Sequence, residues 1–383
     1  MATFGLSSLD EVEGLGVVAG AMPWGPGPLV DVQREEAARA GLSEGPSNDR
    51  IFVDGGGIAS GVALESFRRQ TESIAGDVVG TLAAPLGQWG ACAALGGPVR
   101  LVRARGGGAF DADRAARATS VAITVVSRSF AVRVGDRPGG RALTLELGDA
   151  VLCPVGHWSG ILWANLLSLG PMLWRRLLGP PPLAAARLGW AALSRLTVDR
   201  YRLARAVSVI ERGASVHPSA VVEASWIGAG AVVGPQAVVR GCIVGPEANV
   251  EAHASIQGTV LGRGAVVQRQ GWAWFSVLGD GAGVGGAMQL GVLAPGAQLK
   301  GGAYLMDQAI GGEVRVLRHD ELLPAPLGMI GVGLGAGAIV GSGVWVAPGR
   351  SVPAGAVLAS TQGVVTRWPP PPDSGVRLLT ASS

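Results

Sequence analysis

The sequence predicts an α+β N-terminal domain followed by a long triangular solenoid built from short strands. Four similar words, IGAGA, VGPEA, LGRGA and LGDGA, begin at Ile227, Val244, Leu261 and Leu278, so each starts 17 residues after the last. The 62 glycines lack the every-third-residue spacing of collagen, so they serve another backbone that turns often. With 48% hydrophobic residues, the chain is not a mainly disordered protein.

Residues 1–156 are expected to form the α+β domain. A helix is predicted near 62–73. Strands are predicted near 51–53, 78–82, 99–102, 121–134 and 143–151. The segment VGDRPGGRA, 134–142, supplies a hairpin turn between the last two strands.

Residues 157–212 are expected to form a helical linker, broken by GPPP at 179–182. Eight arginines face only Asp199 and Glu211: Arg175, Arg176, Arg187, Arg195, Arg200, Arg202, Arg205 and Arg212. The first interpretation is a solvated face, and the alternative is contact with an acidic partner or a membrane surface. Pro154, His157 and Pro171 interrupt the uncharged stretch 150–174, so we do not expect a membrane span.

The solenoid prediction for 213–363 rests on aliphatic residues that recur in steps of six, five and six. They are Val216, Val222, Ile227, Val233, Val239, Val244, Val250, Ile256, Leu261, Val267, Leu278, Val284 and Leu290. A helical period of 3.6 residues cannot produce these steps, whereas a three-sided coil with one inward residue per side does. Ala273 stands where an aliphatic residue is due and the step before Leu293 is short, which makes the register uncertain after Trp272.

This pattern resembles the hexapeptide-repeat family, and the resemblance implies a left-handed parallel β-helix. The strict six-residue steps resume at Leu334, Val340, Val346, Val352 and Leu358. Between the two runs, residues 306–328 form an inserted loop, in which EVRVLRHDELL indicates a hairpin turning at 318–320. The tail, 364–383, is expected to be disordered.

A second resemblance lies at the junction of the two parts. GHWSGILWANLLSLG, 156–170, is similar to the segment by which sugar-nucleotidyltransferase domains pass into an appended β-helix. The matching residues are Gly156, Trp158, Ile161, Ala164 and Asn165. The glycine-rich segment 16–32 lacks the arginine and lysine with which those enzymes hold nucleotide phosphates, and Lys300 is the only lysine in the chain. We therefore expect a degenerate, non-catalytic nucleotidyltransferase-like domain.

The charge and the cysteine content indicate which classes of partner and which cellular compartment to expect. A net charge of +3 without a long basic run does not indicate a nucleic-acid partner. Cys92, Cys153 and Cys242 form no C-x-x-C pair, and the N-terminus carries acid where a signal peptide carries base, so a reducing cytoplasm is expected. Membrane contact is not favoured by the sequence.

The four histidines bear on the reaction class. Only His217 and His253 lie in regular coils, too few for the three-histidine site of a β-helical carbonic anhydrase, so no metal is predicted. The acyltransferases of the family are implied to need one histidine as a general base. His253 is the first choice because it shares a polar corner row with Ser219, Gln236 and Gln270.

The other three histidines are less suitable as this base. His319, beside Asp320 on the inserted hairpin, is the second choice as a catalytic base. His217 is interpreted as a cap of the first coil, and His157 as part of the junction.

Trp272 and Trp274 are expected to face outward on one side of the solenoid. They either pack in a homotrimer or line a groove for the acyl or pantetheine part of the donor. The predicted function is acyl transfer from a coenzyme A or acyl-carrier-protein thioester to a sugar or sugar-nucleotide. The alternative is a non-catalytic trimeric structural or regulatory assembly protein.

Overall fold

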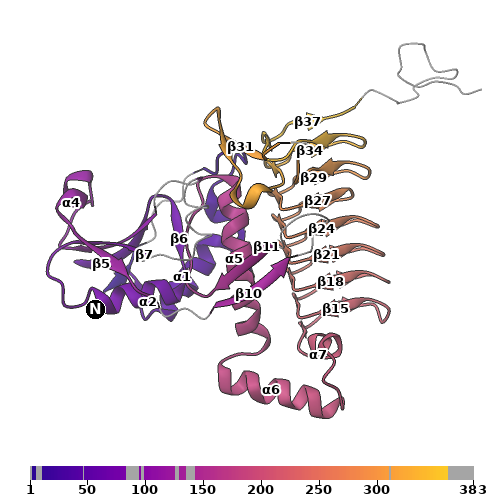
Figure 1. Cartoon of the computed structure of the whole chain (residues 1–383), viewed down its shortest axis with the longest axis horizontal. Helices are drawn as coiled ribbons and strands as arrows, with labels where there is room; N and C mark the ends of the chain where they lie inside the picture. The colour runs from indigo at the N-terminus through magenta and orange to yellow at the C-terminus, as the bar shows by residue number, and fades with distance from the viewer. Residues whose placement is uncertain are drawn as a thin grey trace, which may run out of the picture.

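The computed structural model describes residues 2–5, 11–45, 47–82, 95, 99–125, 129–134, 143–309 and 312–360. An α+β domain lies on one side of the molecule and a prism-shaped β-solenoid on the other, with a long helix between them (Figure 1). The fold class predicted from the sequence is confirmed in both parts.

The N-terminal domain is built on a mixed six-stranded sheet with the order β4-β1-β5-β8-β7-β9. Its strands are β1 (Thr3–Phe4), β4 (Ser43–Glu44), β5 (Asp49–Asp54), β7 (Val78–Leu82), β8 (Arg100–Arg105) and β9 (Thr119–Ile123). The other elements are η1 (Ala19–Ala21), β2 (Pro23–Trp24), β3 (Gly27–Pro28), α1 (Leu29–Arg39), β6 (Gly57–Ala59), α2 (Gly61–Gln70), α4 (Ala112–Arg117), β10 (Ser129–Val134), β11 (Leu143–Gly148) and β12 (Leu152–Pro154). Phe67 of α2 packs with Ile51, Leu101 and Ile123 of the sheet in one core.

Most of the predicted elements of this domain are present. The strands expected near 51–53, 78–82 and 99–102 and the helix near 62–73 correspond to β5, β7, β8 and α2. The single strand expected at 121–134 is wrong, because the chain forms β9 and β10 instead. β10 and β11 pair antiparallel as predicted, and the turn itself, 135–142, lies outside the described residues.

Three helices form the predicted linker: α5 (Trp158–Leu177), α6 (Pro181–Ser194) and α7 (Arg200–Ala206). Sixteen of the 20 residues of α5 are buried, which is the pattern of a helix covered on every side. Its side chains share one core with outward-facing residues of the solenoid, Trp226, Ile243, Val260, Val277 and Val292. In the described part of the chain, no helix is long and apolar enough to cross a bilayer.

The solenoid is a left-handed parallel β-helix with three flat sheets. The first holds β13 (Val209–Ile210), β16 (Trp226–Ile227), β19 (Ile243–Val244), β22 (Val260–Leu261), β25 (Val277–Leu278), β28 (Val292–Leu293), β33 (Gly333–Leu334) and β36 (Ser351–Val352). The second holds β14 (Ser215–Val216), β17 (Val232–Val233), β20 (Asn249–Val250), β23 (Val266–Val267), β26 (Gly283–Val284), β29 (Gln298–Leu299), β34 (Ile339–Val340) and β37 (Val357–Leu358). The third holds β15 (Val221–Glu223), β18 (Val238–Arg240), β21 (Ser255–Gln257), β24 (Trp272–Trp274), β27 (Ala287–Gln289), β30 (Tyr304–Leu305) and β35 (Trp345–Val346).

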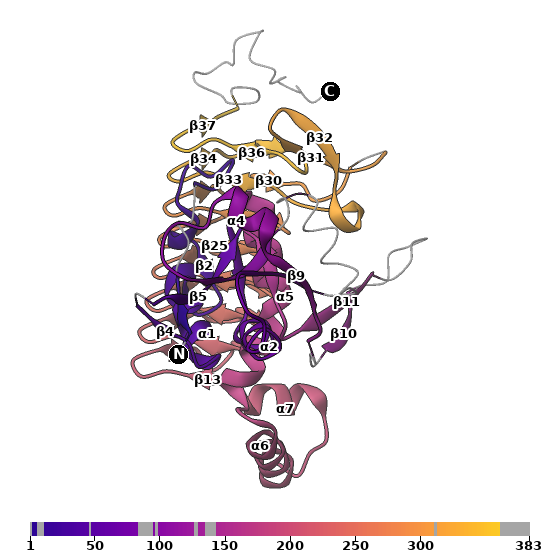
Figure 2. The ribbon, with the colours of Figure 1, turned by 90° about the vertical axis from the view of Figure 1, so that its left-hand side faces the viewer.

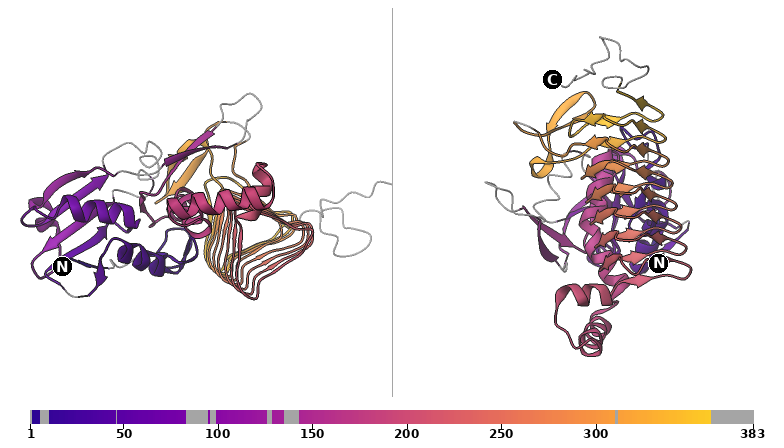
Figure 3. Two further views of the ribbon diagram at one scale, coloured as in Figure 1. Left: turned by 90° about the horizontal axis from the view of Figure 1, so that it is seen from below. Right: turned by 90° about the vertical axis from the view of Figure 1, so that its right-hand side faces the viewer.

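The periodic aliphatic residues point into the prism, and small alanines such as Ala248 and Ala265 fill its corners. Seen from below, the coils superpose as a triangle (Figure 3), and α5 runs parallel to the axis of the solenoid beside the first sheet (Figure 1). Apart from one position, Leu290, the repeat therefore predicted the interior of the solenoid.

The coil that begins at Trp272 is shorter than the 17-residue repeat. Trp272 pairs with Ala287, so this coil has 15 residues, and the corner between Val284 and Ala287 contains only Gly285 and Gly286. The sequence pattern places Leu290 in the inward row, which is wrong: Met288 occupies the interior beside Ala273. Leu290 takes a corner position with a φ of 53°.

The inserted loop contains the predicted hairpin, β31 (Arg315–Arg318) and β32 (Glu321–Pro324), followed by η2 (Pro326–Gly328). Figure 2 shows this hairpin beside the upper coils of the solenoid. The tail that we expect to be disordered lies in 361–383, outside the described residues.

Candidate functional site

The exposed third sheet of the solenoid carries the largest cluster of aromatic side chains on its surface. Trp272 and Trp274 of β24 point outward because strand residues alternate in direction, as predicted, and their ring centroids are 5.2 Å apart. Tyr304 of β30 lies 6.2 Å from Trp272 and 5.9 Å from Trp345 of β35. We call these four residues the aromatic face.

The aromatic face is open to solvent in the single chain. Trp274 is 37% and Trp345 67% exposed. Trp274 donates from Nε1 to the Ser255 hydroxyl at 3.3 Å, which holds its ring across β21. Burial, together with the neighbouring Asp307, raises the pKa of Tyr304, so this phenol stays protonated at neutral pH. A large apolar surface of this kind on a folded protein marks a place where something binds.

His253 lies at the corner that precedes the aromatic face. It adopts a left-handed backbone with a φ of 60°, as do Gln236 and Gln270 in the neighbouring coils, so the polar row predicted from the sequence exists. Two residues later, Ser255 pairs in register with Trp272 and accepts the hydrogen bond from Trp274. The structure thus brings His253 to the same edge as Trp272 and Trp274.

The imidazole of His253 is exposed to solvent. Its backbone N–H donates to the Pro235 carbonyl at 3.0 Å. Over the described ranges, no side chain or carbonyl forms a hydrogen bond or ion pair with its ring.

His319 contacts neither His253 nor the aromatic face. It sits at the tip of the inserted hairpin, where its backbone N–H donates to Glu13 Oε1 at 2.6 Å and its Nδ1 lies 3.5 Å from the same oxygen. Glu13 therefore holds the hairpin against the N-terminal domain. The structure does not join His319 to the aromatic face or to His253 within one chain.

His157 is buried and caps the N-terminus of α5. Its Nδ1 accepts from the Ser159 N–H, and its Nε2 lies 3.3 Å from the Leu317 carbonyl, which can only accept, so Nε2 carries the proton. Desolvation lowers the pKa of this histidine to about 4, against a weaker opposing effect of Glu13. The neutral ring links α5 to the inserted hairpin, which agrees with the structural role expected for it.

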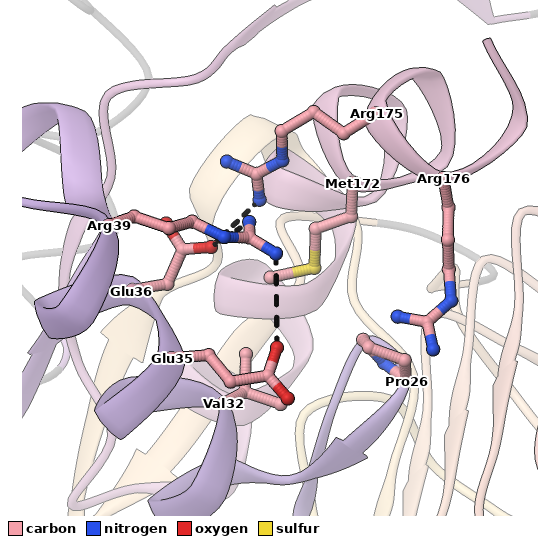
Figure 4. A pocket seen from close by; sticks show the side chains of 8 residues that line it. All are labelled: Pro26, Val32, Glu35, Glu36, Arg39, Met172, Arg175 and Arg176. Atoms are coloured by element: carbon pink, nitrogen blue, oxygen red, sulfur yellow. Dashed lines mark hydrogen bonds and ion pairs between the residues drawn. The ribbon is translucent and has the colours of Figure 1, made fainter. Parts of the chain in front are cut away.

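A small pocket of about 130 Å³ lies between α1 and α5 (Figure 4). At its floor the buried Glu36 accepts from the Gly61 N–H at 2.6 Å, from Arg39 at 2.8 Å and from Arg175 at 2.9 Å. On the opposite wall, the Arg176 guanidinium stacks over Trp226 at 4.3 Å. These contacts already satisfy the carboxylate, so the cluster joins the two halves of the molecule. Sequence reasoning missed it because α1 was not predicted.

The junction motif also has a structural role. Asn165 accepts from the Gly25 N–H and donates to the Pro23 carbonyl, both at 2.8 Å, and Trp24 donates to Ser168 at 2.8 Å. The glycine-rich segment compared with a phosphate-binding loop is therefore fixed to α5, with Trp24 fully buried. Within the described ranges, no three His, Cys, Asp or Glu side chains gather as metal ligands do.

No family model and no curated protein matches the sequence. Among solved structures, a candidate acetyltransferase of Bacillus cereus shares 15% identity with a TM-score of 0.23, over 39% of this chain and 71% of that one. The UDP-N-acetylglucosamine O-acyltransferase of Moraxella catarrhalis shares 13% identity with a TM-score of 0.18, over 39% and 65%. The UDP-N-acetylglucosamine acyltransferase of Francisella novicida shares 13% with a TM-score of 0.16, over 39% and 60%. This chain thus spans less than two thirds of the length of the last two proteins. Their activities are theirs and do not define the activity of this chain.

Proposed function

We propose that this protein is a hexapeptide-repeat acyltransferase. It transfers an acyl group from a coenzyme A or acyl-carrier-protein thioester to a sugar or sugar-nucleotide. The observation that carries the proposal is the exposed imidazole of His253 at the edge of the aromatic face of a left-handed β-helix. A base and an apolar surface side by side are what a thioester donor with a long pantetheine arm requires.

In the proposed reaction, His253 accepts the proton of the acceptor hydroxyl or amine as that atom attacks the thioester carbonyl carbon. The tetrahedral intermediate collapses, the carbon–sulfur bond breaks, and the thiolate leaves. The imidazolium returns the proton to the thiolate, so the products are the acylated acceptor and a free thiol.

Trp272 and Trp274 would contact the donor or the adjoining subunit. We propose a homotrimer in which a neighbouring solenoid lies against the aromatic face and completes the groove. His319 is left to its contact with Glu13, so the proposal assigns the base to His253 alone.

The N-terminal domain is proposed to be nucleotidyltransferase-like and without transferase chemistry of its own. The buried Trp24 and the Asn165 clamp on Gly25 support this, because a phosphate cradle needs free backbone N–H groups. Robust incorporation of radiolabelled nucleotide into a sugar nucleotide would contradict it.

The proposed activity is tested by thiol release. Purified protein is titrated with acetyl- and longer acyl-coenzyme A and a panel of nucleotide sugars, first by thermal shift and then by turnover. We expect a saturable rise in melting temperature with a coenzyme A compound, since a ligand that binds the native state stabilises it. His253→Ala should lower turnover by a factor of roughly 10² to 10⁴, which is the usual contribution of a general base.

His217→Ala is the matched control, because His217 is another exposed corner histidine, in the first coil, with a Ser219 partner. It should leave turnover unchanged, as should His319→Ala. Equal activity of His253→Ala and the native protein would reject the assignment of the base.

One observation favours a second function, a non-catalytic trimeric assembly protein. No residue among those described orients the His253 ring, and the contacts of Glu36, Asn165 and His157 all join domains. A trimer that is folded but shows no shift with any donor and no thiol release would establish this alternative.

A further inference from the structure

Helix α6 exposes its apolar side to solvent. Leu183, Ala186, Trp190 and Leu193 recur in steps of three, four and three, so they share one side of the helix. Trp190 and Leu193 are 70% and 67% exposed, while Ala184 and Ala191 on the other side are buried. Figures 1 and 2 show α6 and α7 projecting at the lower end of the molecule. An ordinary surface helix has the opposite arrangement, with its apolar side toward the core.

The end of α6 keeps this apolar character at a cost in backbone strain. Thr197 N–H donates to the Ala192 carbonyl and Leu196 N–H to the Leu193 carbonyl, the pair of bonds that closes a helix through a left-handed residue. Glycine usually takes that position, but here it is Leu196, with a φ of 46°. Leu196 is 88% exposed and the nearby Val198 is 91% exposed. Packing within the chain gives no reason for leucine at this position, whereas contact with an apolar surface does.

Arginines surround this apolar side. The sequence has no Asp or Glu between Asp149 and Asp199. Arg205 of α7 is exposed and lies 3.5 Å from Glu223, whereas four other arginines of this region are exposed without such a pairing: Arg187, Arg195, Arg200 and Arg202. None of these four forms an ion pair with a carboxylate in the part of the chain that the structure describes.

We propose that α6 and the segment after it, 181–198, bind an anionic lipid surface. Trp190, Leu193 and Leu196 would enter the boundary between headgroups and acyl chains, and the arginines would contact lipid phosphates. The helix lies on the membrane and does not cross it. This inference is independent of the acyl-transfer proposal, and it takes up the second interpretation of the arginine-rich linker, contact with a membrane surface.

A second copy of the chain fits this surface less well. Pairing two α6 helices by their apolar sides would bring both sets of arginines together, with Asp199 as the one nearby acid to offset the repulsion. An anionic bilayer supplies both the apolar phase and the opposite charge.

A groove of about 1020 Å³ lies at the start of α6, where Pro180 and Pro181 line it together with Val62, Trp174 and Asp149. Because Asp149 is acidic, the proposed lipid contact is limited to 181–198.

Vesicle flotation tests the proposal with the full chain. Vesicles of phosphatidylcholine alone are compared with vesicles that also contain phosphatidylglycerol. We expect binding to the anionic vesicles only, weakened by added salt because the headgroup attraction is screened. The double variant Trp190→Glu, Leu193→Glu should bind at least about tenfold more weakly, since two buried apolar side chains are lost.

Two further variants separate lipid contact from unfolding. Val357→Glu, the same change at an exposed residue of the second sheet, should bind as the native chain does. Leu196→Gly should weaken vesicle binding while the melting temperature stays the same or rises, because glycine relieves the left-handed strain.

Three results would overturn the proposal. One is equal binding to neutral and anionic vesicles, and another is native-like binding by a folded double variant. The third is a native chain that binds no vesicles but self-associates in sedimentation, together with a double variant that does not self-associate. That result would assign the surface to contact with a second copy of the chain.

Discussion

Glu36 illustrates how single residues hold the two halves of this molecule together. Its side chain is 2% exposed and accepts hydrogen bonds from a backbone N–H and two arginines, one of them Arg175 of α5, 139 positions along the chain. A buried carboxylate is tolerated only when its lone pairs are satisfied in this way. Both arginines stay partly exposed, so solvent screening reduces the energy of the cluster.

Glu36→Gln tests this view. The amide keeps one acceptor and places an N–H₂ group where a donor already points, so we expect the free energy of unfolding to fall by about 2 kcal/mol. Glu35→Gln, the same change at an exposed residue of the same helix, should cost less than about 0.5 kcal/mol. Urea unfolding of both variants measures the difference, and equal losses would show that the Glu36 contacts do not stabilise the fold.

His157 makes a prediction about pH. Its pKa is about 4 when folded, below the ordinary 6.5, so the unfolded chain binds the proton more tightly. The contribution to stability is therefore complete above pH 6.5 and falls as the pH is lowered from about 6.5 to about 4, by about 3 kcal/mol in all. Asp49 and Asp77, whose pKa values arginine hydrogen bonds hold below the usual range, titrate at lower pH than this window.

Chemical unfolding at several pH values checks this prediction. In His157→Asn, which keeps a side chain able to cap α5, the loss between pH 6.5 and 4 should be smaller than in the native protein. His217→Asn, at an exposed site, should retain the native profile. A steep native-like profile in His157→Asn would assign the effect to other groups.

At the scale of elements, the solenoid and the linker differ in how far the sequence predicts them. Each coil repeats the same local requirement, so the inward rows and the outward direction of Trp272 and Trp274 were predictable. The 15-residue coil was not, because Leu290 also fits the six-residue step although Met288 fills the interior. A shortened corner of two glycines leaves the apolar pattern almost unchanged.

The packing partners of α5 could not be predicted from the sequence either. Its periodicity indicates a helix, but only the fold shows that Trp158 lies against Gly333 of the solenoid, where a β-carbon would come within 2.7 Å of the indole. Contacts such as Asn165 with Gly25 join residues 140 positions apart, and no local pattern announces them. The corner row of His253 was predicted, while its lack of an orienting partner was not.

In the whole molecule, helix α5 already covers one of the three faces of the solenoid. α5 packs on the first sheet, so a trimer that resembles other β-helix assemblies has to form through the other two faces. The aromatic face lies on one of these two sheets, the third, and it adjoins His253. Trimer packing and a groove for the donor therefore concern the same surface, and a single variant can test both.

Trp345→Glu is that variant. Trp345 is two thirds exposed and lies at the far end of the aromatic face, so the change should not harm the fold of the single chain. Burying a glutamate between subunits is costly, and we expect sedimentation to show a trimer for the native protein and a monomer for the variant. If the groove lies between subunits, thiol release should fall with the trimer. A native protein that sediments as a monomer would remove the trimer, and would require His253 and the aromatic face of one chain to bind the donor unaided.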